Sequence, residues 1–229
     1  MLLPTLAGVV LAMAVQTAPP EDEPARVRAV GVPDAPPVLT VGAGEVVLEV
    51  TVSPEGNVQR IDRLRATAPF TDLVASAVEA WKFVPASIVK AGRAEPVESK
   101  VLVVAFFRPP AMYLGGTLGD PIRDVGRPSG EAPSVGSLQV PPYPPRSKGD
   151  GTVVLEVELS SGGGVNNVKV LRSAGGFDEP AIDAVKQWRF TPPRVAGPAR
   201  IYSYVILGFR EPVAGPTIDP RTPTRPPIP

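Results

Sequence analysis

A five-residue sequence that occurs twice limits the possible folds of this chain more than any other feature. It reads Trp-Lys-Phe-Val-Pro from Trp81 to Pro85 and Trp-Arg-Phe-Thr-Pro from Trp188 to Pro192. The same offset of 107 residues aligns 44–85 with 151–192 without a gap, and 17 of these 42 positions are identical. Two copies at so long a period are typical of two small tandem domains rather than of a solenoid.

Each copy has the hydrophobic pattern of two strands followed by a helix. In the first copy, apolar residues recur at every second position from Val46 to Val52, which predicts a strand with one buried face. The turn residues 53–56 lead into a return strand, where the spacing from Val58 to Ile61 predicts a bulge. The apolar stripe from Phe70 to Trp81 then predicts an amphipathic helix.

The third strand of each copy follows, after an expected loop at 85–98 in the first. The run at 101–107 is apolar on both faces. A right-handed crossover gives the expected strand order second, first, third, with the helix on one face. The predicted fold class is α+β: two tandem small domains, each a three-stranded antiparallel sheet with one packed helix. The third strand is then an exposed edge, which natural proteins rarely leave bare.

Proline and glycine mark the segments outside these domains, since the chain contains 31 prolines and 22 glycines. The predicted organisation is a signal peptide or short anchor at 1–18, a Pro-rich spacer at 19–43, the first domain at 44–109, a Pro/Gly-rich linker at 110–139, the second domain at 140–211 and a disordered Pro-rich tail at 212–229.

The first eighteen residues indicate export. Leu2 to Ala18 carries no charge and contains a small-x-small site at Ala12-Met13-Ala14, which favours a cleaved signal peptide and a mature chain from Val15. The alternative is an uncleaved anchor in the inner membrane, although the run is slightly shorter than the roughly 20 residues that span a bilayer. In both cases we expect the rest of the chain to lie in the periplasm.

Composition excludes several classes of function. Lys plus Arg equals Asp plus Glu, at 23 each, which removes the long-range positive field that nucleic-acid binding requires. The chain has no cysteine and no histidine. Thiolate metal sites are therefore excluded, and the commonest metal ligand and general base is absent. We expect no cofactor, no metal and no enzymatic activity.

Several features of the second copy match a known family. They are Tyr143-Pro144, the strand from Gly151 to Ser160, the return strand from Val165 and the motif from Trp188 to Pro192. Together they resemble the C-terminal domain of TonB-family proteins over nearly all of 140–211. The first copy resembles it more weakly over 44–109 and has no Tyr-Pro opening.

The resemblance implies a periplasmic, non-catalytic protein whose last strand pairs with a short peptide from an outer-membrane transporter, so that energy from the inner membrane drives uptake of iron chelates or vitamins. Family transducers carry a transmembrane helix with a histidine and a long spacer before one such domain, whereas this chain has no histidine and two copies. The expected function is therefore the binding of peptide strands from envelope partners, linked to energy-dependent outer-membrane transport. The alternative is an envelope scaffold or cell-wall-binding protein without a transport role.

The predicted partner site is the edge strand of the second domain, consisting of Ile201, Tyr202, Ser203, Tyr204, Val205, Ile206 and Leu207. The expected partner is a peptide of an outer-membrane transporter or another envelope protein, and pairing with the first domain's last strand or with a second copy would also cover the edge. Membrane contact is expected only through an uncleaved N-terminal segment. The repeated aromatic motif is expected in the core and consists of Trp81, Phe83, Pro85, Trp188, Phe190 and Pro192.

Other polar motifs have simpler structural explanations. Ser99-Lys100 and Ser147-Lys148 resemble serine–lysine dyads only as dipeptides, because adjacent side chains on a strand point to opposite faces. The glycine-rich run 160–164 lies between two strands and is expected to be a turn. The carboxylates Glu49, Glu156 and Glu158 are expected on the solvent face of the first strands.

Overall fold

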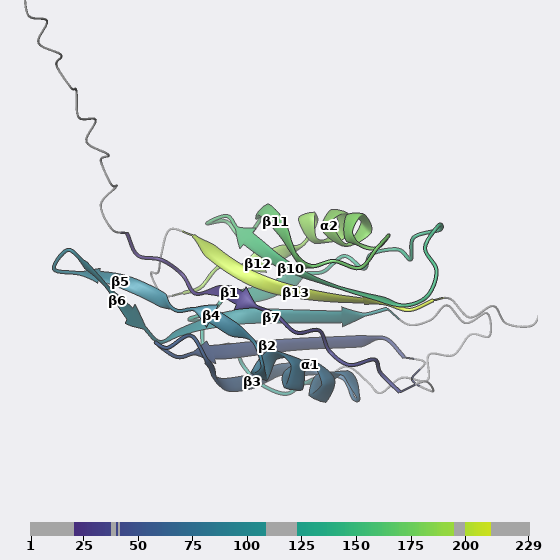
Figure 1. Ribbon diagram of the computed structural model, residues 1–229, viewed down its shortest axis with the longest axis horizontal. Helices are drawn as coiled ribbons and strands as arrows, with labels where there is room; N and C mark the ends of the chain where they lie inside the picture. The colour runs from purple at the N-terminus through teal and green to yellow at the C-terminus, as the bar shows by residue number, and fades with distance from the viewer. Residues whose placement is uncertain (1–20, 38–39, 41, 109–122, 195–199, 212–229) are drawn as a thin grey trace, which may run out of the picture.

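The computed structural model describes residues 21–37, 40, 42–108, 123–194 and 200–211 (Figure 1). The predicted leader and the predicted tail at 212–229 lie outside these residues. The elements of the first half are β1 (Arg26–Ala29), β2 (Gly44–Val52), β3 (Val58–Ala66), α1 (Phe70–Glu79), β4 (Lys82–Val84), β5 (Ala86–Lys90), β6 (Arg93–Val97) and β7 (Ser99–Phe107). Those of the second half are β8 (Arg123–Asp124), β9 (Ser134–Ser137), β10 (Gly151–Leu159), β11 (Val165–Arg172), α2 (Asp178–Lys186), β12 (Arg189–Thr191) and β13 (Ile201–Phe209).

The two long hairpins form as the alternating pattern predicts. β2 pairs antiparallel with β3, and β10 pairs antiparallel with β11. The predicted bulge is confirmed at Gln59, the extra residue between Val58 and Arg60, which face neighbouring residues of β2. Asn166 is the extra residue at the corresponding place in β11. The duplication therefore preserves even the irregularities of the hairpins.

The turn of each hairpin contacts the repeated aromatic motif. Gly56 and Gly163 have φ angles of 81° and 82°, which favour glycine. A Cβ at Gly56 would lie 2.1 Å from the Phe83 carbonyl oxygen, and one at Gly163 would lie 1.8 Å from that of Phe190. The Phe83 N–H donates to the Gly56 carbonyl at 2.8 Å, and Phe190 donates to Gly163 at 2.9 Å. The repeated glycine and the repeated motif thus form one contact that occurs twice.

The long strands form one mixed seven-stranded sheet, in the order β11-β10-β13-β7-β2-β3-β8. Within each half the order second, first, third is as predicted. The prediction of two separate three-stranded sheets is wrong, because the two third strands, β7 and β13, pair with each other in parallel. The register places Val104 beside Val205 at the centre of the molecule. Each half supplies the strand that covers the exposed edge expected in the other.

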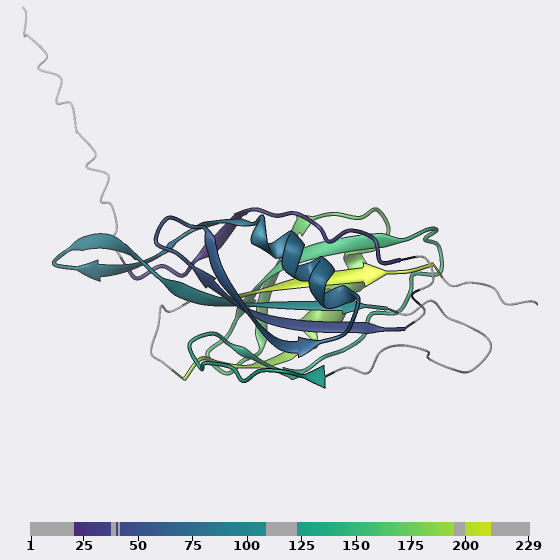
Figure 2. The same cartoon turned by 90° about the horizontal axis from the view of Figure 1, so that it is seen from below.

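The merged sheet explains why its central strands are apolar on both faces. Val103 of β7 and Tyr204 of β13 lie in the core under α1, whereas Val104 and Val205 lie in a second core under α2. The two helices cover opposite faces of the sheet (Figures 1 and 2). An approximate twofold axis along the strands, between β7 and β13, therefore relates the two halves.

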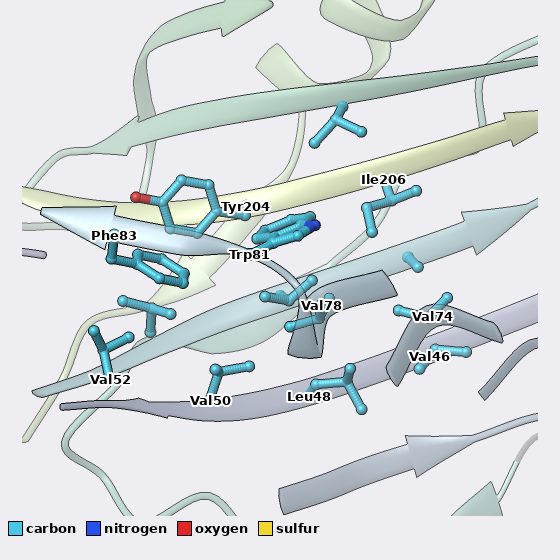
Figure 3. Packing of buried hydrophobic residues seen from close by; sticks show 14 of the residues in the cluster. Val46, Leu48, Val50, Val52, Val74, Val78, Trp81, Phe83, Tyr204 and Ile206 are labelled. Atoms are coloured by element: carbon cyan, nitrogen blue, oxygen red, sulfur yellow. The ribbon is translucent and has the colours of Figure 1, made fainter. Parts of the chain in front are cut away.

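The core under α1 is built by both halves (Figure 3). Val46, Leu48, Val50 and Val52 of β2 line its floor, and Val74, Val78, Trp81 and Phe83 pack onto them. Tyr204 and Ile206 of β13 close it from the second half. The Trp81 and Tyr204 rings meet edge to face, with centroids 5.9 Å apart, which is a favoured aromatic geometry. Burial of apolar side chains from both halves is the main force that joins them.

The segments outside the two predicted domains also take part in the fold. β1 lies in the expected spacer and pairs with β4, and β9 lies in the expected linker and pairs with β12. The repeated unit is thus longer than the aligned sequence, because a short N-terminal strand precedes each hairpin. The expected loop at 85–98 is instead the hairpin β5–β6, which projects beyond the sheet (Figure 1).

Candidate functional site

The predicted partner site, Ile201–Leu207, lies inside the sheet and not at its edge. β13 pairs with β10 along one side over its full length and with β7 along the other side from Ser203 to Gly208. The expectation of an exposed edge here is therefore wrong. An apolar strand with unpaired backbone groups tends to pair with another strand, and here β13 pairs with β7.

The side chains of β13 are buried on both faces. Tyr204, Ile206, Val205 and Ser203 are fully buried. The Tyr204 hydroxyl accepts a hydrogen bond from the Val27 N–H at 3.0 Å, and burial raises the pKa of this phenol well above its usual range. In the described structure no side chain of this central stretch is available to a partner.

The tryptophans of the repeated motif are fully buried and anchor the segment that precedes each hairpin. The Trp81 indole N–H donates to the Gly31 carbonyl at 3.0 Å, and the Trp188 indole N–H donates to the Gln139 carbonyl at 2.8 Å. Each carbonyl lies just before a Val-Pro dipeptide. The remaining motif residues also pack inward: Phe83 and Phe190 are buried, and Pro85 and Pro192 are half-buried.

Two carboxylates expected at the surface are buried. Glu49 is 2% exposed and Glu156 is 3% exposed, at equivalent positions of β2 and β10. They are covered by segments that the sequence assigned to spacer and linker. The Ser129 N–H donates to Glu49 at 3.1 Å, and the Arg26 guanidinium of β1 binds Glu156. The solvent-face prediction is wrong for these two residues, whereas Glu158 is half-buried.

The serine–lysine dipeptides have structural roles. The Lys100 ammonium lies 2.9 Å from Glu131 and 3.6 Å from Glu49, and the hydrogen bond to Glu131 raises the pKa of Lys100. A general base needs a lowered pKa, so Lys100 is held in the wrong state for catalysis. The Ser147 hydroxyl donates to the Gly176 carbonyl at 3.1 Å and fastens a loop.

The glycine-rich run between β10 and β11 is the turn that was predicted. The Gly163 N–H donates to the Ser160 carbonyl at 2.9 Å, and the Gly164 N–H donates to the Ser160 hydroxyl at 2.9 Å. These donors are satisfied within the turn, so they do not form a phosphate site.

The two ends of the sheet differ in the part of the chain that the structure describes. At one end, β8 pairs with β3 through Arg65–Asp124 and Ala66–Arg123. At the other end, β11 is the last strand of the sheet. Its outer side has no paired strand there, and the side chains of Asn166, Asn167, Lys169 and Arg172 are exposed. This outer side of β11 is the candidate site for strand addition, and is called the β11 edge below.

Residues 139–210, which contain the β11 edge, match the family model described as Gram-negative bacterial TonB protein C-terminal. The chain carries a TonB C-terminal domain. No curated protein matches the chain. The family model does not detect the first copy, although β2, β3, α1 and β7 repeat the topology of the TonB domain.

As a family, TonB C-terminal domains are non-enzymatic, energy-transducing domains of the periplasmic cell envelope. Domains of this family bind outer-membrane transporters. Within the described residues, neither α1 nor α2 is long and apolar enough to cross a membrane.

Sequence reasoning missed the segments that complete the TonB domain and its counterpart. Arg26 lies in the expected spacer, and Ser129 and Asp124 lie in the expected linker, yet all three contact the sheet. One signal was present: the Val-Pro segments that begin at Val32 and Val140 resemble each other. Their offset of 108 residues shows that the repeat extends upstream of the hairpins.

Proposed function

We propose that this chain is a periplasmic TonB-family protein that binds an extended peptide strand of an outer-membrane transporter. The observation that carries the proposal is the edge strand β11 inside the TonB C-terminal domain, which has no neighbouring strand on its outer side among the residues that the structure describes. Such an edge binds a peptide through backbone hydrogen bonds, and the side chains of the edge strand add selectivity.

The proposed location differs from the last strand that the family resemblance suggests. In this fold a peptide at β13 would have to displace β7. Leu102 and Val104 of β7 are fully buried in the core under α2, and Val101 and Val103 are buried in the core under α1. Removing β7 would expose both cores, at a cost of roughly 1.5–3 kcal/mol for each large side chain. Addition at the β11 edge requires no such rearrangement.

A binding assay with the full-length protein tests this function. Synthetic peptides that represent the periplasmic N-terminal segments of outer-membrane transporters would be titrated into the protein, with scrambled peptides as controls. We expect sequence-dependent binding that is lost when a proline removes an outward N–H of β11. Equal binding of native and scrambled peptides would contradict the proposal.

A second function, that of an envelope scaffold, is favoured by one observation. The family resemblance implies that the transporter peptide pairs with the last strand, and in this chain β7 already pairs in parallel with that strand, β13. A protein whose duplication fills its own partner site could hold cell-wall glycan and have no transport role. Retention on purified peptidoglycan, together with no binding of any transporter peptide, would favour the scaffold.

A further inference from the structure

The two ends of the sheet are equivalent by duplication, and only one of them has a neighbouring strand in the described structure. β3 and β11 correspond at an offset of 107 residues. β8 pairs with the end of β3, whereas β11 has β10 on one side only. The β3 end therefore shows how such an edge binds a short strand.

The added strand is short, antiparallel and held by charge. Asp124 of β8 lies opposite Arg65, and its carboxylate oxygen is 2.9 Å from the Arg65 Nε. Glu45 of β2 binds the same guanidinium. The Val125 N–H donates to the Leu64 carbonyl at 3.1 Å and continues the backbone pairing. Arg65 is thus held between a carboxylate of its own sheet and one from the added strand.

The equivalent arginine at the β11 edge has neither of these two carboxylates beside it in the described structure. Arg172 corresponds to Arg65, and the residue that corresponds to Glu45 is Thr152. Among the residues that the structure describes, no carboxylate lies within ion-pair distance of Arg172 or of its neighbour Lys169. β11 itself contains two basic residues and no acidic one.

In the described structure, the outward N–H of Val168 is bonded only to a side chain of β11 itself. The Val168 N–H donates at 2.9 Å to the side-chain oxygen of Asn167, its own neighbour, so this N–H points away from β10. Such a local side-chain bond competes with strand pairing for the same N–H, so an added strand would take the place of the Asn167 side chain. Val165, Val168 and Val170 are half-buried against the core under α2, which keeps the strand extended.

We propose that the β11 edge binds an acidic, extended peptide segment of a partner protein. The segment adds as an antiparallel strand and places a carboxylate opposite Arg172, as β8 places Asp124 opposite Arg65. Pairing of two β11 edges is disfavoured, because it would bring Lys169 and Arg172 of one copy close to the same charges of the other. This inference rests on the strand-binding function proposed above and adds to it the chemistry of the ligand.

The test uses the full-length protein and three fluorescent octapeptides that alternate valine with aspartate, asparagine or lysine. We expect binding of the aspartate peptide, at least tenfold weaker binding of the asparagine peptide and none of the lysine peptide. Arg172→Gln should weaken binding of the aspartate peptide roughly two- to fivefold, as expected for one exposed ion pair. Lys186→Gln removes the same charge from an exposed position on α2 and should change nothing.

A cysteine cross-link locates the peptide, since the natural chain has no cysteine. Asn166→Cys on β11 and Gln59→Cys on β3 are exposed and equivalent. An aspartate peptide with one cysteine should form a disulfide with Asn166→Cys in large excess over Gln59→Cys. In Val168→Pro, which removes the outward N–H, binding should fall at least tenfold while the thermal transition persists.

Several results would overturn the inference. They are equal binding of the aspartate and asparagine peptides, equal cross-linking at both cysteines, or peptide binding that appears only after residues 212–229 are removed. Dimerisation of the protein that Val168→Pro abolishes would likewise assign the edge to a second copy. If transporter peptides fail to bind but the aspartate peptide binds at Asn166→Cys, the transport function fails and this inference stands. If transporter peptides bind equally well to the Arg172→Gln and Val168→Pro variants, the transport function stands and this inference fails.

Discussion

Arg26 of β1 binds Glu156 of β10, so a strand from the first half holds a buried carboxylate of the second. The guanidinium also lies over the Tyr202 ring, 4.7 Å from its centroid. The hydrogen bond to Glu156 raises the pKa of Arg26, which favours the charged guanidinium. This pair links the halves independently of the β7–β13 pairing.

Arg26→Met should destabilise the protein by about 1–3 kcal/mol, because it leaves Glu156 buried without its partner. The lower half of that range is expected, since the Arg26 side chain is 40% exposed. Urea unfolding measures the loss. The double variant Arg26→Met with Glu156→Gln should recover most of it, and a double variant less stable than Arg26→Met would show that the pair is not what holds β1.

Replacing either tryptophan with alanine should lower the stability of the protein by a similar amount. Trp81→Ala and Trp188→Ala each remove a fully buried indole and should cost about 3–5 kcal/mol. Because the cores share one sheet, each variant should show a single cooperative melting transition. Calorimetry checks this. Two separate transitions, with only one of them shifted, would indicate independent domains.

Stability should fall above pH 10 in a way that depends on Tyr204. Its pKa in the folded protein is raised by burial above the value of 10.0 for a free phenol, so the folded state keeps a proton that the unfolded state loses. The contribution of the Tyr204 phenol to the free energy of unfolding is therefore fully present below pH 10 and decreases as the pH rises further. Tyr204→Phe should be less stable at pH 8, with a smaller decline between pH 10 and 11. Parallel curves for the two proteins would contradict this origin.

Proline should be tolerated at the edge of the sheet and not at its centre. Val205 lies between two paired strands, so Val205→Pro removes a ladder hydrogen bond and should cost about 3 kcal/mol or more. Val168→Pro on β11 removes only an outward N–H and should cost much less. Thermal melts of the two variants check the difference. Equal losses would mean that β13 and β11 have similar surroundings.

Much of each half could be predicted from the sequence, because its local patterns agree with its fold. Period-two alternation gave β2 and β10, the spacing at Val58 gave the bulge at Gln59, and handedness gave the strand order. What could not be predicted was the pairing of β7 with β13. Both strands are apolar on both faces, which indicates that both faces of the sheet are covered. This pattern does not indicate which part of the chain covers the second face.

The buried carboxylates show a second limit of sequence patterns. Glu49 and Glu156 alternate with apolar residues as solvent-facing residues do, yet the Arg26 and Ser129 segments cover them. The cover comes from proline-rich stretches without hydrophobic periodicity, so no local pattern marks it. For the candidate site, the sequence predicted strand addition but assigned it to β13, because the choice of edge depends on the long-range β7–β13 pairing.

Hydrogen exchange of the β13 backbone amides is the most direct test of the single continuous sheet. Successive N–H groups of a strand point to opposite sides, so those of β13 alternate between β10 and β7. Exchange rates resolved by NMR from Tyr204 to Leu207 should show every amide strongly protected. If every second amide exchanged as fast as an exposed one, β13 would be an edge strand and the two halves would be separate domains.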